Sequence, residues 1–195
     1  MPKYAMVINT NLCSGCQTCS VACKMENMTL PRCARTTVTE TVRGAWEVSL
    51  CNQCENPACV AACESNATWK NAAGVIVIDQ EKCTGCAQCL TACPYGARHI
   101  NSKQGYFKEE PAFEKMVKKV KELYRIRIAG KADKCDFCMH RIQTNRDPMC
   151  VEACTTNARV FGDLDDPKSE AAKLVAKGAK PLKPELGTEP KVFYI

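Results

Sequence analysis

Cysteine thiols are the side chains of this sequence whose number and spacing point most directly to chemistry. The 195 residues include 17 cysteines, and all but one fall into four groups of four. We call these groups quartets one to four in chain order: Cys13, Cys16, Cys19 and Cys23; Cys51, Cys54, Cys59 and Cys63; Cys83, Cys86, Cys89 and Cys93; Cys135, Cys138, Cys150 and Cys154. Cysteines in such groups are typical of iron–sulfur sites, zinc sites or disulfide frameworks.

Quartets one and three share the spacing C-x2-C-x2-C-x3-C, which is typical of bacterial ferredoxins that bind two clusters. Three cysteines so close together lie on a tight loop around one face of a cubane, and their thiolates reach three corners of a [4Fe–4S] cluster. We expect the fourth cysteine at the start of a helical turn, where it points away and binds the other cluster. Each quartet then supplies three ligands to one cluster and one to another, so quartets must occur in pairs.

The chain also repeats itself. The string at residues 8–16 resembles the string at 78–86, and the string at 56–67 resembles the one at 147–158. The quartets therefore follow the order A-B-A-B, which indicates an internal duplication. In each of the second pair of strings, the first cysteine completes a local set of three and the second is donated elsewhere.

Zinc and disulfides are the alternatives to iron. Zinc sites use C-x2-C pairs that are well separated in sequence, and a third cysteine so soon after the second fits that tetrahedral geometry poorly. A disulfide framework requires an oxidising compartment and has no reason to repeat C-x2-C-x2-C. The spacing therefore favours iron–sulfur clusters over both.

Composition agrees with a metal-supported fold. Aromatic residues make up only 6% of the chain, so a conventional apolar core would be poor in large side chains. The formal net charge of +6 is modest, and thiolate-bound clusters carry negative charge that a basic excess offsets. No basic run is interleaved with aromatic residues, so the sequence does not indicate nucleic-acid binding.

The N-terminal stretch MPKYAMVINTNLC has no apolar signal region and no twin-arginine pair. No apolar run approaches the roughly 18 residues that a membrane span needs. We therefore expect a soluble chain without an export signal of its own. Export together with a signal-bearing partner is the alternative.

The elements that must position the cysteines are short. We expect short helices that run from the last cysteine of each quartet, and a hairpin turn at residues 71–74. Strands are expected at residues 4–8, 67–70, 75–78 and 159–161. The predicted fold class is α+β: two bacterial-ferredoxin-like units with two clusters each, related by internal duplication, plus a helical insertion and a C-terminal tail.

Two segments carry no quartet. Apolar residues recur at helical spacing over 111–124, which predicts a helix packed on the ferredoxin body, with a partner surface as the alternative. In the tail we expect a helix from Pro167 to about Ala176, capped by Gly178. The apolar residues 192–195 should pack on the body or on a partner.

Several strings carry a family resemblance. The ordered quartets, PYGAR at 94–98, KCDFCMHR at 134–141 and ARVFGDLDDP at 158–167 resemble the four-cluster electron-transfer subunit of molybdopterin oxidoreductases of the dimethyl sulfoxide reductase family. Polysulfide, thiosulfate, tetrathionate and arsenate reductases have such subunits. The end of the chain, 183–195, also resembles the small subunit of pyrogallol–phloroglucinol transhydroxylase, in which some of the cysteines are missing.

The resemblance implies four [4Fe–4S] clusters, which we call clusters a to d, and a set of ligands for each. The implied ligands are Cys13, Cys16, Cys19 and Cys154 for cluster a; Cys135, Cys138, Cys150 and Cys23 for cluster b; Cys51, Cys54, Cys59 and Cys93 for cluster c; and Cys83, Cys86, Cys89 and Cys63 for cluster d. This pairing agrees with the donated fourth cysteine expected from the spacing.

The resemblance also implies a division of the chain. One unit, closed by the chain ends, holds quartets one and four, and a contiguous unit holds quartets two and three. The expected boundaries are 1–50 with 135–162 for the first unit, 51–100 for the second, 101–134 for the helical insertion and 163–195 for a tail that docks on a partner or on the body.

The expected function follows from what the chain has and lacks. It shows no nucleotide-binding loop, nucleophile arrangement or open metal site, so we expect an electron-transfer subunit that is not catalytic on its own. The resemblance implies a molybdopterin-containing (Mo or W) catalytic partner and, as a further candidate, a membrane quinol-interacting subunit. It also implies a place on the outer face of the cytoplasmic membrane, with a cytoplasmic location as the alternative.

Two other functions stay open at this point. One is a freestanding polyferredoxin or electron hub of a cytoplasmic hydrogenase or formate complex. The other is a redox sensor, although the sequence shows no output domain.

Four residues lie outside this scheme or depart from it. Cys33 belongs to no quartet and is expected to be a small buried residue. His140 lies beside quartet four, where we expect a local hydrogen bond and not a metal ligand. Glu64 and Thr155 occupy positions where such motifs often carry proline, and we expect Glu64 to lower the reduction potential of the nearest cluster.

Overall fold

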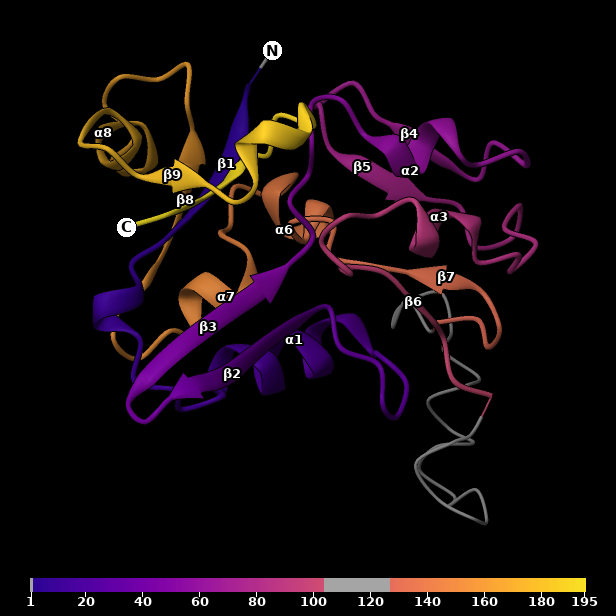
Figure 1. The fold of residues 1–195 in the computed structure, drawn as a ribbon, viewed down its shortest axis with the longest axis horizontal. Helices are drawn as coiled ribbons and strands as arrows, with labels where there is room; N and C mark the ends of the chain where they lie inside the picture. Colours follow the sequence, from indigo (N-terminus) through magenta and orange to yellow (C-terminus); the bar gives the residue numbers. More distant parts are fainter. Residues whose placement is uncertain (1, 104–126) are drawn as a thin grey trace.

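The computed structural model describes residues 2–103 and 127–195 (Figure 1). The helix expected over 111–124 lies outside the described residues. Four small sheets and several short helices make up the described part of the fold, in agreement with the α+β prediction. Within this part, no helix has the length and apolar character that crossing a membrane requires.

The largest sheet joins both ends of the chain. It contains four strands in the order β8-β1-β10-β9, which span Arg159–Asp163, Tyr4–Ile8, Val192–Tyr194 and Lys180–Pro181. β1 pairs antiparallel with β8 and parallel with β10. The strands expected at 4–8 and 159–161 are therefore confirmed, and the apolar end of the chain packs on the body of this protein.

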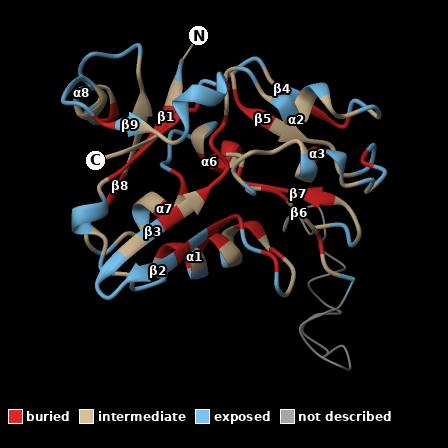
Figure 2. Cartoon of the chain, viewed as in Figure 1, coloured by how far each residue is buried: buried red, intermediate tan, exposed pale blue. Residues whose placement is uncertain are grey.

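The two faces of β1 contact different parts of the molecule, because successive side chains of a strand point to opposite faces. Met6 and Ile8 belong to the core that contains several cysteines. Val7 belongs to a second group with Ala171 of α8 (Glu170–Ala176), which covers the other face. Figure 2 shows β1 as one of the most buried segments. Helix α8 thus packs on one face of the sheet, and the cysteine-containing core lies on the other face.

The tail helix begins later than expected, at Glu170 and not at Pro167. The side chains of Asp163 and Asp166 accept hydrogen bonds from the backbone N–H groups of Asp165 and Lys168. These turns hold the preceding segment out of the helical conformation. The helix ends as expected before Gly178, whose φ of +107° is unfavourable for other residues.

The hairpin predicted around residues 71–74 is confirmed. β4 (Thr68–Lys70) pairs antiparallel with β5 (Ile76–Ile78). Asn71 fixes the turn, because its side chain accepts hydrogen bonds from the backbone N–H groups of Ala73 and Val75 at 3.0 and 2.9 Å.

Two other strand pairs were not expected from the sequence. β2 (Thr36–Val42) and β3 (Ala45–Leu50) form a long hairpin, and β6 (His99–Ile100) pairs with β7 (Ala132–Asp133). Val38, Val48 and Leu50 of the long hairpin are buried in the cysteine-containing core. The hairpin therefore forms one wall of that core.

The helices near the quartets begin earlier in the chain than we expected. They are α1 (Thr18–Asn27), α2 (Ala58–Ala61), α3 (Gln88–Thr91) and α7 (Met149–Glu152). We expected each helix to run from the fourth cysteine of its quartet. Instead, the third cysteine is the second residue of every one, and α2, α3 and α7 end before the fourth.

The local backbone explains this shift. Gln17 and Ala87, just before α1 and α3, have positive φ angles of 63° and 64°, and Pro57 and Pro148 precede α2 and α7. A residue in the left-handed conformation, or a proline, ends the preceding loop, and the right-handed helical turn begins at the next residue. In quartets two to four the fourth cysteine therefore lies just after the helical turn, whereas Cys23 of quartet one lies inside α1.

The remaining elements of the described residues are short. They are the 3-10 helices η1 (Thr10–Leu12) and η2 (Pro184–Leu186) and the helix α6 (Met139–Ile142). Helix α6 directly follows Cys138 of quartet four.

Candidate metal centres

One cavity collects cysteines from quartets one and four. Four thiols line it: Cys13, Cys16, Cys19 and Cys154. Ile8 of β1 and Val38 and Val48 of the long hairpin supply apolar wall residues. The structure thus brings the last cysteine of quartet four to the loop of quartet one.

A second cavity combines quartets two and three in the same way. Four thiols line it: Cys51, Cys54, Cys59 and Cys93. Pro57, Tyr95 and Ile76 contribute to its wall. Again three cysteines come from one quartet and the fourth comes from the end of another.

A third group of cysteines includes two thiols that contact Asn27, the last residue of α1. Its thiols interact electrostatically with one another: Cys23, Cys135, Cys138 and Cys150. The Asn27 side chain donates hydrogen bonds to the sulfurs of Cys23 at 3.5 Å and Cys138 at 3.6 Å. Burial and the nearby thiol of Cys150 raise the pKa of Cys23 to about 12.

In the fourth group, only some of the cysteines share a common core. Cys83 and Cys89 are buried in a small core against which Cys63 packs, whereas Cys86 is exposed. The backbone N–H of Ala132 in β7 donates to the Cys83 sulfur at 3.4 Å. Cys63 of quartet two thus packs on the small core that contains two cysteines of quartet three.

Polar groups near the sulfurs favour the thiolate form at some positions. Hydrogen bonding by Thr18, and to a lesser extent by Thr155, lowers the pKa of the exposed Cys16 to about 6. Phe137 donates its backbone N–H to the Cys135 sulfur at 3.4 Å. Such bonds to sulfur are typical of iron–sulfur sites, where they also tune the reduction potential.

These donor sets fit iron–sulfur clusters. All 17 cysteines are free thiols in the structure. Where thiols gather in the interior, burial raises the pKa of Cys54 and Cys150 to about 11, and neighbouring cysteines contribute to the rise. Bringing such thiols together as thiolates requires a positive centre among them, which the iron of a cluster provides.

The residues outside the quartets behave as expected where the structure describes them. Cys33 is 3% exposed and accepts a hydrogen bond from the backbone N–H of Ser102 at 3.3 Å, so it is a buried structural cysteine. His140 is hydrogen-bonded to Glu26 at 2.7 Å, which is the local contact expected of it. Glu64 accepts from the Gln88 side chain at 3.1 Å, and its effect on potential stays a prediction.

Sequence reasoning missed three polar side chains that contact the cysteines. Asn27, Arg98 and Arg159 are buried, and none was singled out for its own chemistry. For the arginines a signal existed, since both follow the last cysteine of a quartet at the same distance. For Asn27 the signal was only local, one helical turn after Cys23, because its second contact, with Cys138, joins positions far apart in the chain.

These shared cavities define a protein of the ferredoxin type, in which cysteines from different quartets meet around common sites. The family profile described as 4Fe-4S dicluster domain matches residues 42–121 and 120–164. The B subunit of tetrathionate reductase from Salmonella typhimurium is 39% identical over 99% of this chain and 72% of that protein. The B subunit of selenate reductase from Mesobacillus selenatarsenatis is 38% identical over the same shares.

A further relative matches almost end to end. The arsenate respiratory reductase iron–sulfur subunit of a Shewanella species is 34% identical over 99% of this chain and 96% of its own length. The chain therefore belongs to the iron–sulfur subunits of the dimethyl sulfoxide reductase family and has a ferredoxin-like 4Fe–4S dicluster fold. It is an electron-transfer subunit that is not catalytic on its own, and 16 of its 17 cysteines form the quartets that fit four [4Fe–4S] clusters.

Proposed function

We propose that this chain carries electrons to or from a molybdopterin-containing (Mo or W) catalytic subunit, through four clusters with the ligand sets given above for clusters a to d. The two cavities lined by three cysteines of one quartet and the last cysteine of another support this proposal most directly. The relatives named as B subunits of reductases support a catalytic partner.

The chain's own residues hold and shield each site. When bound, a cluster supplies one-electron chemistry. The cysteine thiolates would hold the cluster. Backbone and side-chain donors such as Ala132 and Asn27 bond to the ligand sulfurs, and the long hairpin of β2 and β3 lines the site of cluster a. These contacts fix the ligand sulfurs in place and limit the access of water to them.

We also propose that the fold consists of two ferredoxin-like units related by internal duplication. The first comprises 1–50 and 135–162, the second 51–100, with 101–134 as an insertion and 163–195 as the tail. The pairing of β1 with β8 supports the first unit, because it joins the start of the chain to the segment after quartet four.

The ligand sets can be tested by replacing one cysteine that is a proposed ligand and one that is not. The chain is purified without oxygen from its own source, and about 16 iron atoms per chain are expected. Cys154→Ser should alter the spectroscopic signal of the cluster held by quartet one, because this cysteine completes that site. Cys33→Ser, outside every proposed set, is the control and should retain all the iron. Unchanged signals in the Cys154 variant would contradict the assignment.

The same purification tests the partner. Molybdenum or tungsten that co-purifies in stoichiometric amount would support the catalytic subunit, whereas iron alone would favour a freestanding carrier. We place the complex on the outer face of the cytoplasmic membrane through a partner's export signal, and a membrane quinol-interacting subunit would complete it. Protease accessibility in intact spheroplasts distinguishes this location from the cytoplasmic alternative.

A further inference from the structure

Two buried arginines occupy the same position relative to two different quartets. Arg98 follows Cys93, and Arg159 follows Cys154, with four residues between the cysteine and the arginine in each case. The two arginines are only 6% and 4% exposed. Two long cations buried at equivalent places in repeated segments require an explanation.

Arg98 lies between quartets two and three. Its Nη2 donates to the Cys59 sulfur at 2.9 Å, and its Nη1 donates to the Thr68 hydroxyl at 3.3 Å. It lines the cavity proposed for cluster c and also interacts electrostatically with Cys89, a proposed ligand of cluster d. The guanidinium therefore interacts with both sites of the second unit.

Arg159 has the matching place between quartets four and one. Its Nη2 donates to the Thr36 hydroxyl at 2.7 Å, and the residue lines the cavity proposed for cluster a. It interacts electrostatically with Cys150 and Cys135 of quartet four and with Cys19 of quartet one. Its Nη1 is buried and has no hydrogen-bond partner among the described residues. A residue that lines the thiol-lined cavity thus has one buried N–H donor left without a partner.

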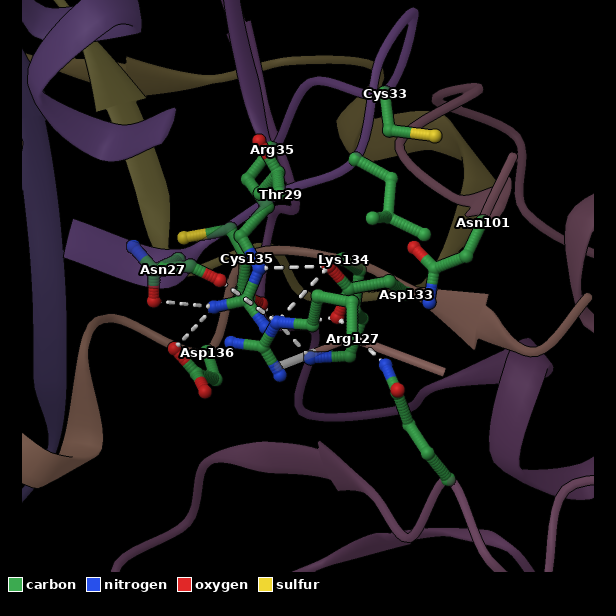
Figure 3. A network of polar contacts seen from close by, with 12 residues as sticks. Asn27, Thr29, Cys33, Arg35, Asn101, Arg127, Asp133, Lys134, Cys135 and Asp136 are labelled. Carbon is green, nitrogen blue, oxygen red and sulfur yellow. Dashed lines mark hydrogen bonds and ion pairs between the residues drawn. The ribbon is translucent and has the colours of Figure 1, made fainter. Parts of the chain in front are cut away.

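A third buried arginine shows what is different about these two. Arg35 forms ion pairs with Asp133 at 2.7 Å and with Asp136 at 3.0 Å (Figure 3). Within residues 2–103 and 127–195, no carboxylate forms an ion pair with Arg98 or Arg159, and their main electrostatic partners are cysteines. Because a buried cation needs a compensating anion, the cysteine sites must supply it.

We propose that Arg98 and Arg159 have matching roles. Each places a fixed positive charge between the two clusters of one ferredoxin-like unit, and this charge raises the reduction potentials of both clusters. This inference rests on the ligand sets under "Proposed function". Accepting one electron makes a cluster site one unit more negative, and no bond to the arginine forms or breaks. A nearby fixed cation and an N–H donor to sulfur both stabilise that added charge.

The test uses the full cluster-loaded chain and the pair Arg98→Gln and Arg159→Gln, each of which is the control for the other. Midpoints of all four clusters are measured by redox titration followed by paramagnetic resonance. Arg98→Gln should lower the midpoints of clusters c and d only, and Arg159→Gln those of clusters a and b only. We expect about a tenfold fall in the reduced-to-oxidised ratio at the wild-type midpoint, roughly 59 mV for a one-electron couple.

Lysine variants separate charge from hydrogen bonding. Arg98→Lys and Arg159→Lys keep the charge but lose the planar fork, so the same two midpoints should fall by less than in the glutamine variants. The lysine variants also replace a glutamine variant in the midpoint measurement if that variant does not take up its clusters. Loaded variants whose four midpoints all match wild type, or all move together, would overturn the proposal. Wild-type chain without about 16 iron atoms would instead overturn the four-cluster assignment on which the inference rests.

Discussion

Asn27 shows how one side chain can connect a site to the rest of the protein. It is fully buried, donates to the sulfurs of Cys23 and Cys138, and accepts from Nη1 of Arg35 at 2.8 Å (Figure 3). Arg35 is held in turn by Asp133 and Asp136. The amide therefore has a fixed orientation, with its NH2 group directed at sulfur.

Asn27→Leu should lower the midpoint of cluster b, because the apolar side chain cannot donate to either sulfur. It should also destabilise the fold by roughly 1–3 kcal/mol, since Arg35 loses a buried acceptor. Redox titration and chemical unfolding measure the two effects. Asn11→Leu, at an exposed position of η1, is the control. An unchanged midpoint in a fully loaded Asn27 variant would show that these bonds do not tune the site.

Glu64 gives a prediction of opposite sign. It follows Cys63 directly, and its carboxylate disfavours the addition of an electron to the nearest cluster. Glu64→Gln should therefore raise one midpoint slightly, and the shift should shrink at high salt because the residue is exposed. Glu170→Gln removes an exposed carboxylate at the start of α8, and this variant should leave all four cluster midpoints unchanged. Equal midpoints for wild type and the Glu64 variant would end this interpretation.

At the scale of elements, the long hairpin is fitted to the loop of quartet one. Gly15 has a φ of +70°, and a Cβ built there would overlap the Trp46 ring of β3. Gln17 of the same loop donates its side-chain N–H to the Val38 carbonyl of β2 at 2.7 Å. The hairpin therefore packs on the cysteine loop at a point where only glycine leaves room.

Gly15→Ala should displace the Trp46 indole and destabilise the chain by more than the roughly 1 kcal/mol that positive φ alone costs. Gly44→Ala is a matched control, because Gly44 has a φ of +82° and a Cβ at that position would have no atom within 4 Å. Thermal unfolding and tryptophan emission compare the two variants. Equal destabilisation without a change in emission would show that the Trp46 contact is unimportant.

The elements also show what the sequence could predict. Strands with continuous apolar runs, such as β1, and the hairpin around Asn71 were predictable from local pattern and turn chemistry. The helix starts were misplaced because they depend on the left-handed conformation of Gln17 and Ala87, which residue type does not reveal. Contacts such as Arg98 with Cys59 join distant positions, so spacing within a quartet could not predict them.

At the scale of the whole molecule, the C-terminal segment connects the large sheet with the loop of quartet two. Strand β10 pairs with β1, and Lys191 donates its backbone N–H to the Asn52 carbonyl at 2.8 Å. The Thr188 hydroxyl is bonded to Tyr95 at 2.5 Å, and both residues line the cavity proposed for cluster c. Residues 188–195 thus supply an inner strand of the sheet, between β1 and β9, and support a site in the other part of the protein.

Deleting residues 188–195 should therefore lower both the unfolding temperature and the iron content. The deletion exposes the edge of β1 and removes Thr188 from the wall of the cluster c cavity. Tyr194→Phe is the mild control: it removes the hydrogen bond to the Val48 carbonyl, should cost about 1 kcal/mol, and should retain full iron. Because Thr188 touches one cavity, the cluster lost first should be the one whose ligands include Cys54. A truncated chain with full iron and wild-type unfolding temperature would show that this segment serves partner docking and not the integrity of the body.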